Sequence, residues 1–265
     1  MSQTIGIGVV TYNRQAVLFD TLKAIAQHTG TLAHLIVADD GSMDDTRDAL
    51  QHHRIPFVTG ETRGMAWNKN RALFWLAHVK KCDHIIILED NTGPQDDGWE
   101  KLWIDGARRY GHVNLAGHWF EHSFISGSGS AEDPILSLDV SGQCSAFSRE
   151  AILFGGLLDT RFKGFGFEHV EHTIRLIRLG YGGRHDYVEG ELRTLYYLLK
   201  TRMTHAPTAS FNDPDIIRYN QTLCHDLLRD MSFRSGMQNE DEIKTLRAEM
   251  GFTTGRDEQT PSLDR

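Results

Sequence analysis

The chain has few cysteines, no cluster of basic residues and no long apolar run. Its 265 residues include 3 cysteines, Cys82, Cys144 and Cys224, which lie far apart and outside any C-x-x-C spacing. This pattern argues against a disulfide framework and predicts buried, reduced thiols. No segment approaches the roughly 18 consecutive apolar residues that a membrane-spanning helix needs, and the first residues carry no basic stretch. We therefore expect a cytoplasmic protein without a signal peptide or transmembrane helix.

The charge balance is acidic. Lys and Arg total 28 against 36 Asp and Glu, a formal net charge of −8. Binding to nucleic acid rests on clustered Lys and Arg that neutralise phosphates, so nucleic acid is not an expected partner. An acidic site would also repel a diphosphate, because two like charges ~4 Å apart cost on the order of 4 kcal/mol at an effective dielectric of about 20. A divalent cation between site and ligand would remove this cost.

Short apolar runs alternate with segments of helical periodicity in the first third of the chain. Strands are predicted at 5–10, 35–37, 55–58 and 84–88, and helices at 15–27, 44–53 and 64–79. This alternation is typical of an α/β protein with a mostly parallel, doubly wound sheet. Ligands bind such sheets at the carboxyl ends of the strands. The polar residues that follow the first, second and fourth strands are therefore expected to converge on one crevice.

Capping signals predict two helices near the end of the chain. Asp213 precedes a proline as an N-cap, and Asn239 is an N-cap with Glu242 in the capping-box position and Gly251 as a C-cap. The stretch 123–132 is rich in Ser and Gly and predicts a mobile loop. The predicted organisation is a domain over 1–205, a C-terminal helical extension over 206–251 that is a candidate surface for homo-oligomer formation, and a flexible tail over 252–265.

Two patterns near the N-terminus, Val9 to Arg14 and Ile36 to Thr46, resemble the opening strand and the D-D-G-S-x-D-D-T element of the family 2 glycosyltransferases. The resemblance implies a GT-A fold, which is Rossmann-like, and a nucleotide-sugar donor. It also implies that Tyr12 stacks near the base while Asp40, with Asp39, accepts hydrogen bonds from base or ribose. By residue type alone, the two aspartates fit a solvated turn equally well. The donor-binding residues that this element implies are Thr11, Tyr12, Asn13, Arg14, Asp39 and Asp40.

Two further segments extend the resemblance on the donor side. Ile85 to Asn91 is similar to the family's D-x-D region, in which the last acid binds Mn²⁺ or Mg²⁺ and the ion bridges the donor phosphates. Asp90 is the expected metal ligand and Glu89 is expected to face the ribose. Asn91 stands where many relatives have a third acid. Some relatives recruit a further histidine ligand near the C-terminus, for which His205 is the candidate here.

The segment Arg63 to Leu73 is similar to the family's G-x-x-x-x-R-N element, with Lys69 and Asn70 in place of Arg and Asn. A helix N-terminus with nearby cations suits a diphosphate, so Gly64 and Lys69 join the predicted donor-binding residues. From the residues alone, a surface amphipathic helix is the alternative interpretation.

Gly155 to Glu171 is similar to the G-G-F-D-E-x-F-x-G-x-G-x-E-D-x-D motif of the acceptor side. In inverting members, its E-D pair supplies the base that deprotonates the acceptor hydroxyl. Glu168 matches the first acid, whereas His169 occupies the place of the aspartate. Both are candidate catalytic bases, because a neutral imidazole is also competent near pH 7. The departure keeps a retaining reaction open beside the expected inverting one.

The resemblance, which covers about residues 4 to 190, implies a glycosyltransferase that uses Mn²⁺ or Mg²⁺. The enzyme would move a sugar from a nucleotide-diphosphate sugar, UDP-sugar foremost, to a hydroxyl on a glycan or other acceptor. Two alternatives stay open. A sugar-phosphate nucleotidyltransferase shares the fold but usually carries a glycine-rich basic loop after the first strand, which this chain lacks. A catalytically silent nucleotide-sugar or glycan-binding module would account for His169 and Asn91.

Overall fold

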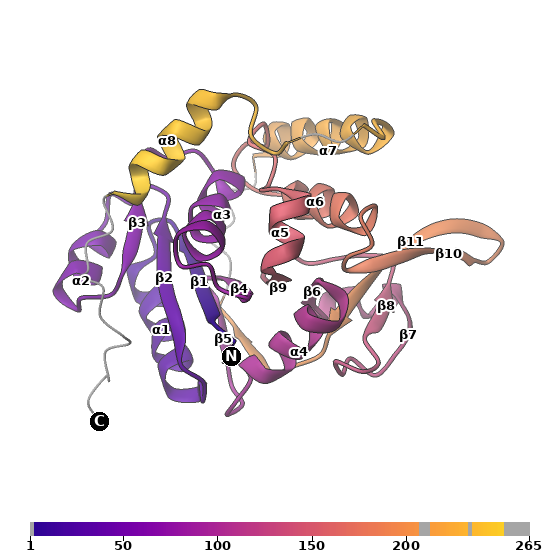
Figure 1. Cartoon of the computed structure of the whole chain (residues 1–265), viewed down its shortest axis with the longest axis horizontal. Helices are drawn as coiled ribbons and strands as arrows, with labels where there is room; N and C mark the ends of the chain where they lie inside the picture. Colours follow the sequence, from indigo (N-terminus) through magenta and orange to yellow (C-terminus); the bar gives the residue numbers. More distant parts are fainter. Residues whose placement is uncertain (1–2, 207–212, 233–234, 252–265) are drawn as a thin grey trace.

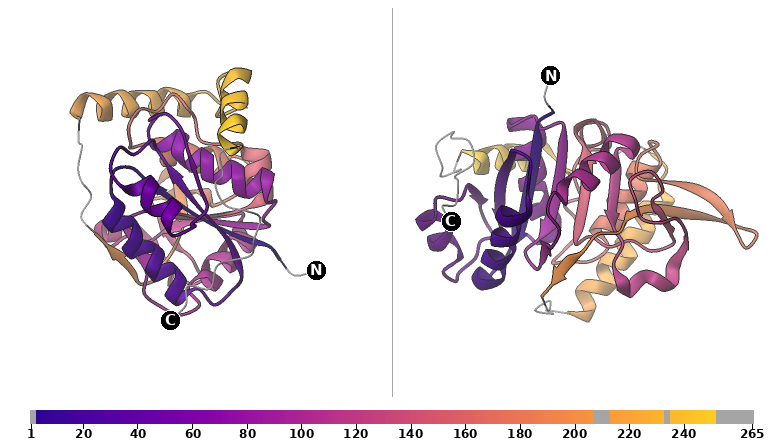
Figure 2. Two further views of the ribbon diagram at one scale, coloured as in Figure 1. Left: turned by 90° about the vertical axis from the view of Figure 1, so that its left-hand side faces the viewer. Right: turned by 90° about the horizontal axis from the view of Figure 1, so that it is seen from below.

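A computed structural model describes residues 3–206, 213–232 and 235–251, so the tail predicted over 252–265 lies outside the described residues. A central sheet carries helices on both faces (Figures 1 and 2). The strands of this sheet are β1 (Ile5–Thr11), β2 (Ala33–Asp39), β3 (Phe57–Thr59), β4 (His84–Glu89), β6 (His112–Leu115), β7 (Phe124–Ser126), β8 (Ile135–Ser137), β9 (Cys144–Ser148), β10 (Gly183–Val188) and β11 (Glu191–Leu199). The helices are α1 (Gln15–His28), α2 (Thr46–His52), α3 (Met65–Phe74), α4 (Glu100–Tyr110), α5 (Arg149–Gly155), α6 (Glu168–Ile177), α7 (Pro214–Arg229) and α8 (Glu240–Met250).

The strand order is β3-β2-β1-β4-β9-β6-β11-β8-β7, with β10 paired to β11. From β3 to β4 neighbouring strands run parallel, which confirms the predicted doubly wound arrangement. β9 then pairs antiparallel with both β4 and β6. A small second sheet joins β5 (Thr92–Pro94) to β12 (Met203–His205). Two further turns of helix are η1 (Trp75–Val79), which continues α3, and η2 (His118–Ser123).

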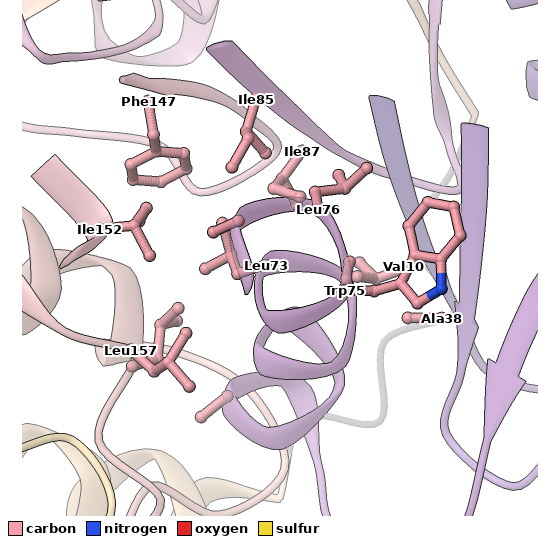
Figure 3. Close-up of a cluster of buried hydrophobic side chains, with 14 of the residues drawn as sticks. Val10, Ala38, Leu73, Trp75, Leu76, Ile85, Ile87, Phe147, Ile152 and Leu157 are labelled. Atoms are coloured by element: carbon pink, nitrogen blue, oxygen red, sulfur yellow. The ribbon is translucent and has the colours of Figure 1, made fainter. Parts of the chain in front are cut away.

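The central strands are buried on both faces, as expected for a parallel sheet covered by helices. Along β4, Ile85 and Ile87 pack against α3, while Ile86 and Leu88 face the opposite core. Figure 3 shows the first of these clusters around α3. In β1, a Cβ on Gly8 would lie 2.9 Å from that of Ala72 in α3, so glycine lets this helix approach the sheet closely. The three cysteines are free and buried, as the sequence predicts.

The two C-terminal helices begin where the capping signals place them. Asp213 accepts hydrogen bonds from two N–H groups of the first turn of α7, and Asn239 accepts one from Glu242 in α8. In a capping box the Glu242 carboxylate would accept from the N–H of the N-cap residue Asn239. Here it accepts from the N–H of Gln238, one residue earlier. α8 lies over α3 and β3, and α7 lies over α6 (Figure 1).

The composition of the stretch 123–132 predicts a mobile loop, but part of the stretch belongs to the sheet. It contains β7, and the carbonyl of Gly129 accepts a hydrogen bond from Lys200 N–H at 2.9 Å. Phe124 pairs with Ser137 of β8. The first half of this stretch is therefore part of the sheet, and Gly129 ties the second half to the end of β11.

Candidate active site

Polar side chains from the ends of β1, β2 and β4 meet at one edge of the sheet. The Thr11 hydroxyl donates to Asp90 Oδ2 at 2.7 Å, and the Thr11 carbonyl accepts from Asp40 N–H at 3.0 Å. β1 lies between β2 and β4, so the loops after these strands are neighbours. The convergence expected from the order of the predicted strands is therefore found.

Asp90 is buried at the end of β4 beside a cation. Its Oδ1 accepts from Arg14 Nη1 at 2.9 Å. Burial raises the pKa of Asp90 to about 6, because removing a carboxylate from water penalises the charged form more than Thr11 and Arg14 offset. An additional positive charge at this position would therefore favour ionised Asp90.

Asn91 immediately precedes β5, and His205 lies on β12, the strand that pairs with β5. The Asn91 amide donates to the carbonyl of Ala206 at 3.1 Å, and its oxygen accepts from the Thr92 hydroxyl. His205 lies opposite Thr92 in the register. Burial, together with His118, lowers the pKa of His205, which favours the neutral imidazole that metals require.

In the described part of the chain, no three His, Cys, Asp or Glu side chains converge as a metal site. An ion carried by a nucleotide needs only one or two carboxylates, because phosphate oxygens and water complete its coordination. The carboxylate of Asp90, the amide oxygen of Asn91 and the neutral ring of His205 are oxygen and nitrogen donors of the kind that Mn²⁺ and Mg²⁺ accept. By donor type these three residues suit an ion that a nucleotide carries, and the described side chains form no closed metal cage.

The loop after β1 presents Tyr12 to solvent, with 43% of its surface exposed. Asn13, at φ 51°, adopts the left-handed conformation that asparagine tolerates well. Its N–H donates to Ser42 Oγ at 2.8 Å, and its Oδ1 accepts from Met43 N–H at 2.7 Å. Asn13 thus ties the first loop to the second and leaves the Tyr12 ring available for stacking.

The two aspartates at the end of β2 are already engaged by the protein. Asp39 is fully buried and accepts from Ser42 N–H and from the Thr59 hydroxyl.

Asp40 accepts from the N–H groups of Arg63 and Gly64, at 3.0 and 2.8 Å, and from Arg71 Nη1 at 2.8 Å. Burial raises the pKa of Asp40 despite these donors. The implied hydrogen bonds from both aspartates to a nucleoside stay a prediction, and a nucleoside would have to share them with these protein groups.

Lys69 connects the predicted donor side to the predicted acceptor side. Its buried Nζ lies 3.2 Å from Glu89 Oε1 and 3.3 Å from Glu168 Oε1, and it donates to the Gly142 carbonyl at 3.0 Å. Burial alone would lower the pKa of Lys69, but the two carboxylates raise it. Lys69 is therefore a cation held between two carboxylates. The sequence predicted that Lys69 contacts the donor and did not predict these two ion pairs.

The two candidate bases differ in exposure. The Glu168 side chain is 3% exposed, while that of His169 is 23% exposed. Burial would raise the pKa of Glu168, but Lys69 holds it well below the ordinary value. Glu168 also accepts from Gly166 N–H at 2.7 Å. The His169 ring lies between two acceptors, with Nδ1 3.4 Å from Glu168 Oε1 and Nε2 3.3 Å from the Val140 carbonyl.

Several polar groups around the site carried no functional signal in the sequence. His112 is buried, lines the same small cavity as His169 and stacks on Phe147 with ring centroids 4.4 Å apart. Burial lowers the pKa of His112 to about 4. Arg71 and Glu249 form a buried ion pair behind Asp40. Capping signals place Asn220 and Glu249 on helices, but nothing in the local sequence indicates that they reach the site.

The fold is that of the GT-A glycosyltransferases. The structure resembles a mannosyltransferase from Pyrobaculum calidifontis, solved with GDP-Man and Mn²⁺, at a TM-score of 0.58 and 13% identity, covering 93% of this chain and 74% of that one. It also resembles S. aureus TarS at 0.57 and 12% identity, covering 96% of this chain but 44% of TarS. For the TarS 1-349 fragment with UDP-GlcNAc the TM-score is 0.54 at 12% identity, with 95% and 74% covered.

Part of the sequence also matches a protein-family model. Residues 7–103 match the model of glycosyl transferase family 2. No curated protein matches the chain. The stretch 7–103, 97 of the 265 residues, is what the chain shares with that family, and the structural likeness at 12–13% identity shows the GT-A fold. Among the described helices, none is long and apolar enough to cross a membrane.

Proposed function

We propose that the chain transfers a sugar from a UDP-sugar to an acceptor hydroxyl, with inversion at the anomeric carbon and with a divalent cation on the donor. The observation that supports this most is the pair of contacts made by Lys69. Its Nζ lies 3.2 Å from Glu89, at the end of β4, and 3.3 Å from Glu168 of the acceptor motif. Donor and acceptor motifs are thus joined by a single side chain.

On the donor side, Asp90, Asn91 and His205 would hold Mn²⁺ or Mg²⁺. When bound, the ion supplies positive charge to the two phosphates and to the departing nucleoside diphosphate. Arg14 Nη1 lies 2.9 Å from Asp90 Oδ1 and adds a permanent positive charge next to this carboxylate. Tyr12 offers an exposed ring to the base.

On the acceptor side, we assign His169 as the catalytic base and Glu168 as its partner. Glu168 is ion-paired with Lys69 and almost fully buried, which makes it a poor proton acceptor. To take the hydroxyl proton, one His169 ring nitrogen must face the acceptor, so its contact with either the Glu168 carboxylate or the Val140 carbonyl must open. The other ring nitrogen then keeps its N–H on the remaining protein acceptor, which orients the ring.

The test is release of nucleoside diphosphate from a panel of UDP- and GDP-sugars with candidate acceptors, in Mn²⁺, in Mg²⁺ and in EDTA. We expect metal-dependent release with a UDP-sugar and formation of the inverted product. Binding of nucleotide without turnover for every donor would favour the silent module. Release of pyrophosphate from a nucleoside triphosphate and a sugar phosphate would instead identify a nucleotidyltransferase.

The metal assignment has its own test. Asp90→Ala should abolish the Mn²⁺-dependent part of the thermal stabilisation by UDP, a loss of about 2–3 kcal/mol when ligand is at roughly 100 times its Kd. Asp48→Ala, on the exposed surface of α2, is the matched control and should keep the full shift. A full shift in Asp90→Ala would show that the ion lies elsewhere.

A further inference from the structure

We infer that the C-terminal helices position the two sides of the site, each through one buried polar side chain. Glu249 of α8 supports the donor side, and Asn220 of α7 supports the acceptor side. The names donor side and acceptor side rest on the proposed function, whereas the contacts of Glu249 and Asn220 are independent of it.

Glu249 holds the arginine that holds Asp40. Its two oxygens accept from Arg71 Nη2 and Nε, each at 3.0 Å, in a bidentate pair. Oε2 also accepts from Trp67 Nε1 at 3.1 Å. On its other side Arg71 donates to Asp40 Oδ1 at 2.8 Å, and its side chain is fully buried. A buried guanidinium between two carboxylates is sensitive to the loss of either one.

The geometry around Glu249 is close-fitting. A Cβ added to Gly60 would lie 2.1 Å from Glu249 Oε1, so glycine at this position gives the carboxylate its space. Asp40 in turn accepts hydrogen bonds from the N–H groups of Arg63 and Gly64, which end the loop before α3. Through this sequence of contacts, the last turn of α8 controls where the donor loop 61–64 lies.

Asn220 of α7 supports a loop on the acceptor side, as Glu249 supports the donor loop. It is completely buried, and its amide accepts from Lys163 N–H at 3.0 Å and donates to the carbonyls of Lys163 and Phe165, at 2.7 and 3.1 Å. The next residue, Gly166, donates its N–H to Glu168. Asn220 therefore fixes the backbone directly in front of the Glu168–His169 pair.

The two supported loops touch each other. Met65 N–H donates to the Gly164 carbonyl at 2.6 Å, and a Cβ on Gly64 would lie 2.8 Å from Gly164 N. Covering the core requires only apolar residues of the two helices, such as Leu227 and Leu246. A pair of buried polar side chains aimed at the loops on either side of this contact therefore points to a positioning role in addition to packing.

The experiment compares Glu249→Gln and Asn220→Ala with the exposed-face controls Arg247→Gln and Gln221→Ala. Amide hydrogen exchange followed by mass spectrometry is the first readout. Glu249→Gln should accelerate exchange about tenfold in residues 61–68 and leave 163–170 unchanged, a change of roughly 1.4 kcal/mol in local opening. Asn220→Ala should do the reverse, and neither control should change either segment.

Kinetics is the second readout. Glu249→Gln should raise the donor KM about tenfold with kcat within about twofold, and Asn220→Ala should lower kcat about tenfold with donor KM within about twofold. Gly60→Ala places a Cβ against both the Glu249 carboxylate and Arg71 Nη2, so it disturbs their ion pair without altering either residue and should reproduce the Glu249→Gln pattern. If Asn220→Ala does not fold, Asn220→Gln, which shifts the amide by one methylene, takes its place.

Two results would overturn the inference: exchange that accelerates equally in both segments, or kinetic losses that disappear once the fraction of folded protein is equalised. The proposed function fails separately, if the wild-type chain turns over no donor. In that case the exchange pattern still decides whether the helices position the two loops.

Discussion

On the predicted donor side, Thr11, Asp40 and Asp90 lie at or just after the ends of parallel strands within the first ninety residues, and Thr11 contacts both aspartates there. One distant side chain, Glu249, supports them through Arg71. On the acceptor side, Glu168 depends on Lys69 from α3 and on a loop held by Asn220 from α7. The family model likewise matches 7–103 and not the acceptor motif. The comparison teaches that the two sides differ in degree: the proposed donor site is mostly built from segments near in sequence, whereas the proposed acceptor site is assembled from distant ones.

Breaking the contact between the two sides should have the largest effect. Lys69→Met removes a buried cation and leaves Glu89 and Glu168 without their shared partner, which we expect to cost about 3–5 kcal/mol in the free energy of unfolding. Urea denaturation measures this cost. Lys23→Met, at an exposed position of α1, is the matched control.

A second variant separates charge from shape. Adding Glu168→Gln to Lys69→Met should restore part of the lost stability, because one of the two uncompensated carboxylates is gone, while activity stays low. A Lys69→Met protein as stable as the wild type would show that the bridge is not an energetic link between the two sides.

The acceptor side can be tested without disturbing the donor side. His169→Gln removes the proposed base and should lower kcat by about 10²–10⁴, while the affinity for UDP stays unchanged. Steady-state kinetics and calorimetric titration with UDP measure the two quantities. Unaltered kcat in His169→Gln, together with a large loss in Glu168→Gln, would transfer the role of base to Glu168.

The smallest expected effect is a change with pH in the free energy of unfolding, caused by the buried His112. The pKa of His112 is about 4 in the folded protein, below its ordinary value of 6.5. Below pH 6.5 the unfolded chain therefore takes up a proton that the folded chain does not. Stability should fall by about 1.4 kcal/mol per pH unit from this group as pH drops toward 4, and level off below that.

His112→Gln isolates this contribution. The free energy of unfolding of the wild type minus that of the variant should decrease by about 2 kcal/mol between pH 6.5 and pH 5. Parallel pH profiles for the two proteins would contradict the burial argument for His112.

Local patterns in the sequence were sufficient for the parallel half of the sheet and for the donor loops. Apolar runs of three to six residues followed by polar turns identify β1, β2 and β4, and the carboxyl-end rule brings Thr11, Asp40 and Asp90 together. The capping residues Asp213 and Asn239 mark the starts of α7 and α8. These features depend on interactions among residues near in sequence, which is why a single sequence reveals them.

Only the tertiary structure showed which groups those residues meet. Lys69 lies 99 positions from Glu168, and Arg71 lies 178 positions from Glu249. No periodicity or cap links residues so far apart, because their pairing arises when separate elements pack and buried charges must find partners. The sequence alone determined the fold class and the donor motifs, while the packing of α6, α7 and α8 decided how the candidate base and the donor loop are held.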